Sequence, residues 1–159
     1  MAKAPLVSNT TPIIKLVGIG LLDLLPQLYG QIIIPEHVLI EYRAGAQPTD
    51  PQLEVIPWVE VHAVSIAPDL LDILDVGEAA AITLAEAHGA RAVLMDDRAG
   101  RRVAQARGLE VIGTLAVLLR AKTANLIPAV GPVIDTMLAQ GRHISPALRA
   151  HVLAVVGET

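Results

Sequence analysis

The sequence predicts an α/β domain in which a central, mostly parallel sheet is covered by helices on both faces. Short aliphatic runs alternate with longer segments whose apolar residues recur at helical spacing. The short runs are apolar throughout, which is typical of strands buried on both faces. The chain has 159 residues, 53% of them hydrophobic and 2% aromatic, so we expect one domain over residues 1–159 with an aliphatic core.

In the first half, apolar runs predict strands at residues 5–8 and 31–34. Between them, helical spacing of apolar residues predicts a helix over 13–25, with Pro12 suited to the first turn and Gly18 and Gly20 as weak points. A second helix is expected over 36–43. Proline and glycine predict a loop over 44–57, and the alternation in VEVHAV predicts an edge strand within 55–64.

The second half continues the alternation of helix and strand. Strands are expected at residues 91–95 and 109–112. Helices are expected at residues 69–74, 77–88, 97–107, 113–122, 128–140 and 146–155. Ser145 caps the last of these helices, with Pro146 at its first position.

Composition excludes several classes of protein. The absence of cysteine excludes disulfides, thiol catalysis and cysteine-bound metals. A formal net charge of −4 argues against a protein that coats nucleic acid by bulk charge, but permits a nuclease with a local arginine cluster. No apolar run is long enough to cross a membrane, and the N-terminus lacks the apolar region of a signal peptide, so we expect a cytoplasmic protein.

Polar side chains follow the predicted strands or lie on the next helices. They are Asn9, Glu41, Glu78, Asp96 and Asp97. Because the carboxyl ends of parallel strands form the ligand-binding edge of such sheets, we expect these groups to converge. Converging carboxylates repel one another unless their pKa values rise or cations are bound. Oxygen ligands without cysteine favour Mg²⁺ or Mn²⁺, whose usual chemistry here is phosphoryl transfer.

Each of these residues also has an ordinary structural interpretation. Asp97 suits the N-cap of the helix that follows, with Asp96 as an exposed neighbour. Glu78 lies in a first helical turn, where the helix dipole favours an acid. Glu41 pairs with Arg43 or is solvated, and Asn9 is a turn or cap residue. The order of all these residues along an α/β chain carries more weight than any one of them.

Five stretches resemble the PIN-domain family of metal-dependent nucleases. They are VSNTTPIIKL (7–16), IIIPEHVLIEYRAG (32–45), LDVGEAAAITLA (74–85), VLMDDRAGRRVA (93–104) and GLEVIGTLAVLLRAKTANLI (108–127). The similarity runs from about residue 6 to 149, in the family's order and spacing, and GEAAAI and MDDRAGRR are its most specific parts. The chain most resembles a prokaryotic branch close to the toxins of VapC-type toxin–antitoxin pairs.

The resemblance implies a three-layer α/β/α PIN-like fold and an acidic cluster that binds Mg²⁺ or Mn²⁺ for RNA cleavage. The family's acids correspond to Asn9, Glu41, Glu78 and either Asp96 or Asp97. Asn9 is a departure, because the family usually has Asp there. An amide oxygen can ligate a hard cation but brings no charge.

The resemblance also implies substrate and partners. The RNA would be cut to 5′-phosphate and 3′-hydroxyl ends. Thr10 and Thr11 lie near a strand end, where their hydroxyls could position the water or a phosphate or could simply cap the next helix. Arg98, Arg101 and Arg102 share a helix flank and could contact the RNA backbone, or form a solvated face. A small antitoxin would insert a basic side chain among the acids. The low charge of residues 123–138 suggests a homodimer surface, with core packing as the alternative.

Two other functions compete with the endoribonuclease. Because Asn9 replaces the usual acid, the chain could be a catalytically weakened PIN-like module that binds protein or RNA without cutting. A phosphoacceptor receiver-like domain also uses paired acids at strand ends. Those acids would follow the first strand, where PLVSN offers none.

Overall fold

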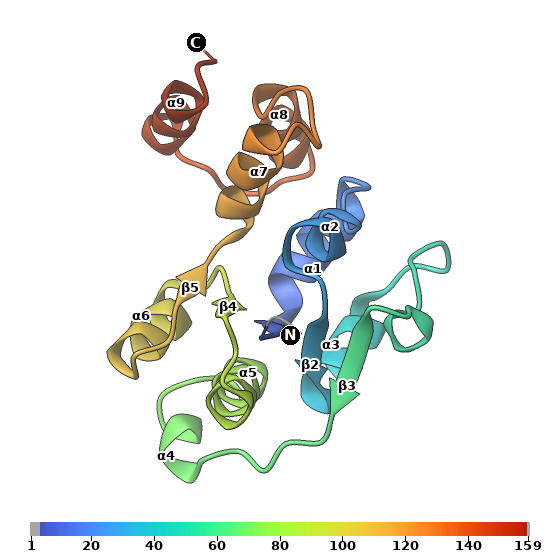
Figure 1. Cartoon of the computed structure of the whole chain (residues 1–159), viewed down its shortest axis with the longest axis vertical. Coiled ribbons are helices and arrows are strands. Elements are labelled where there is room, and N and C mark those ends of the chain that lie inside the picture. Colours follow the sequence, from blue (N-terminus) through green and yellow to red (C-terminus); the bar gives the residue numbers. More distant parts are fainter. Residues whose placement is uncertain (1–3, 159) are drawn as a thin grey trace.

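A five-stranded sheet forms the centre of the computed structural model, which describes residues 4–158 (Figure 1). The strand order is β3-β2-β1-β4-β5, and every pair is parallel. The strands are β1 (Leu6–Ser8), β2 (Ile32–Pro35), β3 (Val59–His62), β4 (Ala92–Leu94) and β5 (Val111–Ile112). The expected edge strand is β3, and the predicted α/β fold with helices flanking a parallel sheet is confirmed.

Successive side chains of the strands enter two different cores, as the alternation of a pleated strand requires. On β1, Leu6 packs into one cluster and Val7 into the other. On β4, Leu94 belongs to the first cluster, whereas Val93 belongs to the second together with Met95, which directly follows the strand. The sheet is therefore buried on both faces, which explains why its strands are apolar without interruption.

Two sets of helices cover these faces. Buried residues of the first cluster come from α1 (Thr10–Gly18), α2 (Leu24–Tyr29), α3 (Glu36–Gly45), α7 (Thr114–Thr123), α8 (Gly131–Ala139) and α9 (Pro146–Val155). The second cluster is covered by α4 (Pro68–Leu71), α5 (Val76–His88) and α6 (Arg98–Ala106). Figure 1 shows α7, α8 and α9, in orange to red, at one end of the molecule and α4 and α5, in green, at the other.

The predicted helix over 13–25 is wrong in one respect, because the chain forms two helices there. Helix α1 ends at Gly18, and Gly20 adopts a φ of +72°, a left-handed conformation that glycine accepts without strain. Helix α2 then starts at Leu24. The loop over 44–57 contains a short 3-10 helix, η1 (Leu53–Val55). Within residues 4–158, the helices are all too short or too polar to span a bilayer.

The strand order reverses around β1, which lies between β2 and β4. The backbone N–H of Asn9 donates to the carbonyl oxygen of Leu94 at 2.9 Å, so the chain leaves β1 and β4 at the same edge of the sheet. A crevice outside the carboxyl ends of the strands at such a reversal is where ligands bind in open α/β sheets. The fold therefore brings Asn9 close to the segment that holds Asp96 and Asp97.

Candidate functional site

Three side-chain oxygens from three parts of the chain surround Gly77, in the first turn of α5. A Cβ atom at Gly77 would lie 3.1 Å from Oε2 of Glu41, 3.4 Å from Oδ1 of Asn9 and 3.7 Å from Oδ1 of Asp75. A Cβ atom there would be in close contact with the Glu41 oxygen, so the glycine lets these oxygens approach α5 closely. We call the oxygens of Asn9, Glu41 and Asp75 around Gly77 the oxygen cradle.

Asn9 supplies the most informative of these oxygens. Asn9 is only 6% exposed, and its Oδ1 has no hydrogen-bond partner among residues 4–158. Thr10, next in the chain, is fully buried, and in the same described range its hydroxyl is also without a partner. Buried polar atoms are nearly always hydrogen-bonded, and a specific exception points to a ligand, a water or an ion.

Glu78 lies beside the oxygen cradle and is 7% exposed. Its burial, together with the neighbouring carboxylates of Asp75 and Asp97, raises the pKa of Glu78 to about 9. A Cβ atom at Gly100 would lie 2.7 Å from Oε2 of Glu78, so this carboxyl reaches α6 only because residue 100 has no side chain. In the absence of a cation, Glu78 therefore holds a proton at neutral pH.

Asp75 and Asp97 begin the two helices that meet at Glu78. Oδ1 of Asp75 accepts a hydrogen bond from the backbone N–H of Glu78 at 2.8 Å, which caps α5. Oδ2 of Asp97 accepts one from the backbone N–H of Gly100 at 2.9 Å, which caps α6 as the sequence predicts. Both carboxylates keep further acceptor capacity, because an ionised carboxylate can accept several hydrogen bonds.

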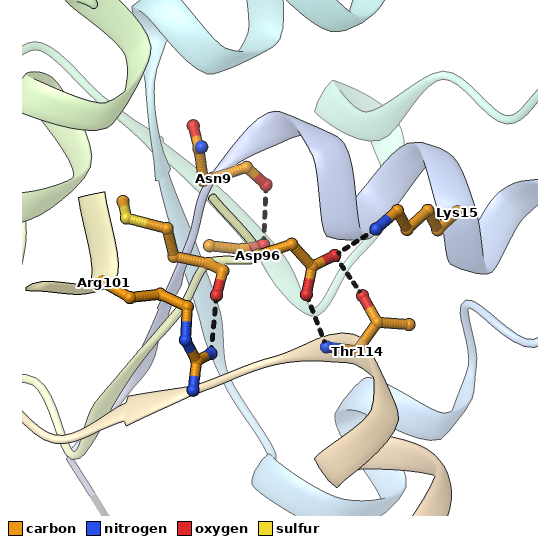
Figure 2. A network of polar contacts seen from close by, with 7 residues as sticks. Asn9, Lys15, Asp96, Arg101 and Thr114 are labelled. Carbon is orange, nitrogen blue, oxygen red and sulfur yellow. Dashed lines mark hydrogen bonds and ion pairs between the residues drawn. The ribbon is translucent and has the colours of Figure 1, made fainter. Parts of the chain in front are cut away.

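Asp96 belongs to a different network, on the other side of the same loop (Figure 2). Its Oδ2 pairs with Nζ of Lys15 at 3.0 Å and accepts from the hydroxyl of Thr114 at 2.7 Å. Its Oδ1 accepts from the backbone N–H of Thr114 at 2.8 Å. Figure 2 shows the side-chain amide of Asn9 pointing away from these contacts. The expectation of an exposed Asp96 is wrong, because this half-buried side chain ties β4 to α1 and α7.

The three arginines lie on α6, close to Asp96. Arg98, Arg101 and Arg102 line a hollow of about 270 Å³ together with Asp96 and Gln105. Arg101 is already engaged, because its guanidinium donates to the backbone carbonyl of Met95 at 2.9 Å (Figure 2). Arg98 and Arg102 are exposed. The hollow therefore offers positive charge on α6 next to Asp96.

The family model described as DUF3368: PIN domain matches residues 5–158, nearly the whole chain. The chain belongs to the PIN-domain family. PIN domains are generally nucleases and typically use divalent metal ions. Searches of curated proteins and of solved structures give no significant match to the chain.

The oxygen atoms of the cradle in this PIN domain are of the type that binds a hard divalent cation, but the acids are not arranged as a complete metal site. Within the part of the chain that the structure describes, no three Asp, Glu or His side chains stand together in an arrangement that could hold a metal. The oxygen cradle instead combines an amide oxygen with carboxylates, and all its members are the oxygen ligands that Mg²⁺ and Mn²⁺ prefer. A bound ion would supply the partner that the buried Asn9 oxygen lacks among the described residues.

Two residues of the PIN domain escaped the sequence analysis. Asp75 precedes Glu78 by three positions, which is the spacing of a helix-capping pair and could have identified it. Lys15 gave no comparable signal, because its partner Asp96 lies 81 positions away along the chain. The structure separates the five polar residues that the sequence predicted to converge. Asn9, Glu41, Glu78 and Asp97 lie around the first turns of α5 and α6, whereas Asp96 faces Lys15 and Thr114.

Proposed function

We propose that this PIN domain is a Mg²⁺- or Mn²⁺-dependent endoribonuclease that hydrolyses phosphodiester bonds at the oxygen cradle. One observation carries the proposal: the buried oxygen of Asn9, which has no hydrogen-bond partner among residues 4–158, lies with carboxylate oxygens of Glu41 and Asp75 around Gly77. When bound, a divalent ion lowers the pKa of water and neutralises charge on a phosphodiester. That chemistry matches the nuclease character of the family.

The side chains have distinct roles in this proposal. Asn9, Glu41 and Glu78 would hold the cation, and Glu78 would serve as a ligand in its deprotonated form. Of the two adjacent aspartates, Asp97 would be the ligand, because the Asp96 carboxylate is already occupied by Lys15 and Thr114. We keep a supporting role for Asp96, which fixes the loop from which Asp97 projects.

Substrate contacts would come from α6 and from the start of α1. Arg98 and Arg102 are exposed on α6, the helix that Asp97 caps, and can bind RNA phosphates, with Arg101 fixed to the backbone of Met95. The buried hydroxyl of Thr10 lies next to Asn9 in the chain and can donate to a water or a phosphate oxygen. These arginine side chains would position the RNA backbone without selecting a base sequence, because contacts with phosphates are independent of sequence.

We further propose that the chain acts in the cytoplasm as the toxin of a VapC-type toxin–antitoxin pair. Exposed apolar residues lie close in the chain to the acids of the cradle: Ile40, which is 64% exposed, precedes Glu41, and exposed Ile73 and Val76 lie within two positions of Asp75. A small antitoxin could cover this surface and place a basic side chain among the acids. In residues 123–138, where the sequence suggested a homodimer surface, Ile127, Val130, Ile134 and Met137 are buried in the first cluster, so much of this segment packs into the core. We propose that a homodimer contact would instead use exposed Leu148 and Val155 of α9.

A second candidate function is a binding module that does not cut. Asn9 favours it, because an amide in place of a carboxylate lowers the charge available to a cation. This module would still bind RNA through Arg98 and Arg102, with a strong dependence on salt. Binding without metal-dependent cleavage is the result that separates it from the nuclease.

The test is cleavage of a labelled single-stranded RNA by metal-stripped, antitoxin-free protein, with Mg²⁺ or Mn²⁺ added back. Glu78→Gln and Asp97→Asn should abolish cutting, because each removes an oxygen charge at the site. Asp23→Asn is the matched control, since Asp23 is exposed and lies beyond the far end of α1 from Asn9. Folded protein that cuts with neither metal refutes the nuclease and favours the binding module.

A further inference from the structure

Asp75 occupies a place in the oxygen cradle that capping alone does not require. Its Oδ1 accepts from the backbone N–H of Glu78 at 2.8 Å, which accounts for one lone pair of one oxygen. The same atom lies 3.7 Å from the position that a Cβ on Gly77 would take. Oδ1 of Asn9 and Oε2 of Glu41 approach that position to 3.4 Å and 3.1 Å.

The charge of the cradle depends on Asp75. Asn9 contributes an oxygen without charge, so Glu41 would be the only formal charge among these three groups if Asp75 were absent. Ligand charge is one of the main factors that set the affinity of oxygen sites for divalent cations. Asp75 restores, at the same cluster around Gly77, the charge that an acid at position 9 would have supplied.

Asn9 provides the independent sign that a ligand belongs here. Its side chain is more than nine-tenths buried, and its Oδ1 faces the cradle without a hydrogen-bond partner in residues 4–158. A purely structural cluster would be expected to satisfy that oxygen from a neighbouring N–H. The carboxylates of Glu41 and Asp75 cannot do so, because ionised carboxylates only accept hydrogen bonds.

We propose that Asp75 is a ligand of the divalent cation and supplies the negative charge that Asn9 lacks. This inference rests on the proposed function, because it concerns the same cation. It adds a ligand from the residue that precedes α5 to the set of Asn9, Glu41, Glu78 and Asp97. The main alternative is that Asp75 serves only as the N-cap of α5.

Asp75→Asn separates these two roles. Asparagine caps helices about as well as aspartate, so the variant keeps α5 intact but removes the charge. Asp75→Ser is a second cap-preserving variant, in case the first fails to fold. Asp23→Asn again serves as the control, because it removes the same charge from a surface beside Val17 and Trp58.

The experiment is a calorimetric titration of the RNA-free full chain with Mn²⁺, so its result does not depend on cleavage. We expect Asp75→Asn to weaken Mn²⁺ binding by about tenfold or more, and Asp23→Asn to leave it unchanged. Asn9→Asp should tighten binding, and the double variant Asn9→Asp with Asp75→Asn should bind about as well as the wild type. That compensation is not expected of a residue that only caps a helix.

The possible failures are distinct. Unchanged Mn²⁺ affinity in folded Asp75→Asn or Asp75→Ser overturns the role of Asp75 and leaves the nuclease proposal standing. An equal loss of Mn²⁺ affinity in Asp23→Asn also overturns the role of Asp75, because the loss then follows from the change in net charge. A wild-type chain that binds no Mn²⁺ at millimolar concentration refutes the proposed metal site itself, and the role of Asp75 with it.

Discussion

Glu78→Gln tests the acidic cluster through the stability of the metal-free protein. The pKa of Glu78 rises from its ordinary value of 4.5 to about 9, chiefly because the side chain is buried and next because Asp75 and Asp97 lie beside it. Between these two values the native chain holds one proton more than the unfolded chain. The free energy of unfolding is therefore highest below the ordinary pKa and falls as the pH rises toward 9.

The size of this effect follows from one proton. The loss is at most about 1.4 kcal/mol per pH unit, or about 2.7 kcal/mol between about pH 5.5 and 7.5. Solvent at the open side of the cluster screens the charges, so we expect about 1–2 kcal/mol over that interval. The glutamine variant cannot ionise at this position and should lack this part of the pH dependence.

The assay is urea unfolding at both pH values in the presence of EDTA, for the wild type, Glu78→Gln and an exposed-acid control, Glu110→Gln. The Glu78→Gln protein should gain stability relative to the wild type as the pH rises, whereas the control should track the wild type. Added Mg²⁺ should flatten the wild-type curve, because the cation stabilises the ionised carboxylate. Parallel curves for the wild type and Glu78→Gln would refute a native-state proton on this residue.

Three further predictions concern the surroundings of the cluster. Asp96→Ala should lower the free energy of unfolding by about 2–3 kcal/mol, because it leaves Lys15 and two donors of Thr114 without their acceptor. Asp97→Ala should lower it by about 1 kcal/mol, because it removes only the N-cap of α6. Urea unfolding measures both changes. Gly77→Ala should preserve or raise stability, since alanine favours helices by about 1 kcal/mol, yet weaken Mn²⁺ binding in calorimetry because its Cβ enters the oxygen cradle. Arg98→Gln with Arg102→Gln should weaken binding of a catalytically inactive variant to RNA, with a salt slope smaller by about 1–2 in filter-binding titrations.

The sheet and its edge follow from local patterns that the sequence displays openly. Strands buried on both faces are apolar throughout, so β1, β2 and β4 were recognisable from residues such as Leu6, Ile33 and Val93. The parallel arrangement then placed Asn9 and the two aspartates after β4 at one edge. The break between α1 and α2 was harder, because glycine at position 20 can continue a helix at modest cost or end it.

The partners of individual acids were not predictable, because they depend on contacts distant in the sequence. Helical spacing placed Glu41 near the apolar face of α3, yet the residue is exposed and only its Oε2 approaches Gly77. The glycine itself gave no signal of its role, which is to leave space for oxygens from other elements. Asp75 was accessible in principle, since its position three residues before Glu78 is that of a helix cap.

The adjacent Asp96 and Asp97 illustrate how one backbone rule separates two like charges. In an extended chain, successive side chains point to opposite sides, and the alternation seen in Leu94 and Met95 continues past the end of β4. Asp96 turns toward the face covered by α1 and α7, where Lys15 neutralises it. Asp97 turns toward the face of α5 and α6 and lies close to Glu78. The end of β4 thus provides one carboxylate that stabilises the fold, Asp96, and one that keeps acceptor capacity for a cation, Asp97. For this reason Asp97→Asn is the more informative variant for metal binding, and Asp96→Ala is the more informative variant for stability.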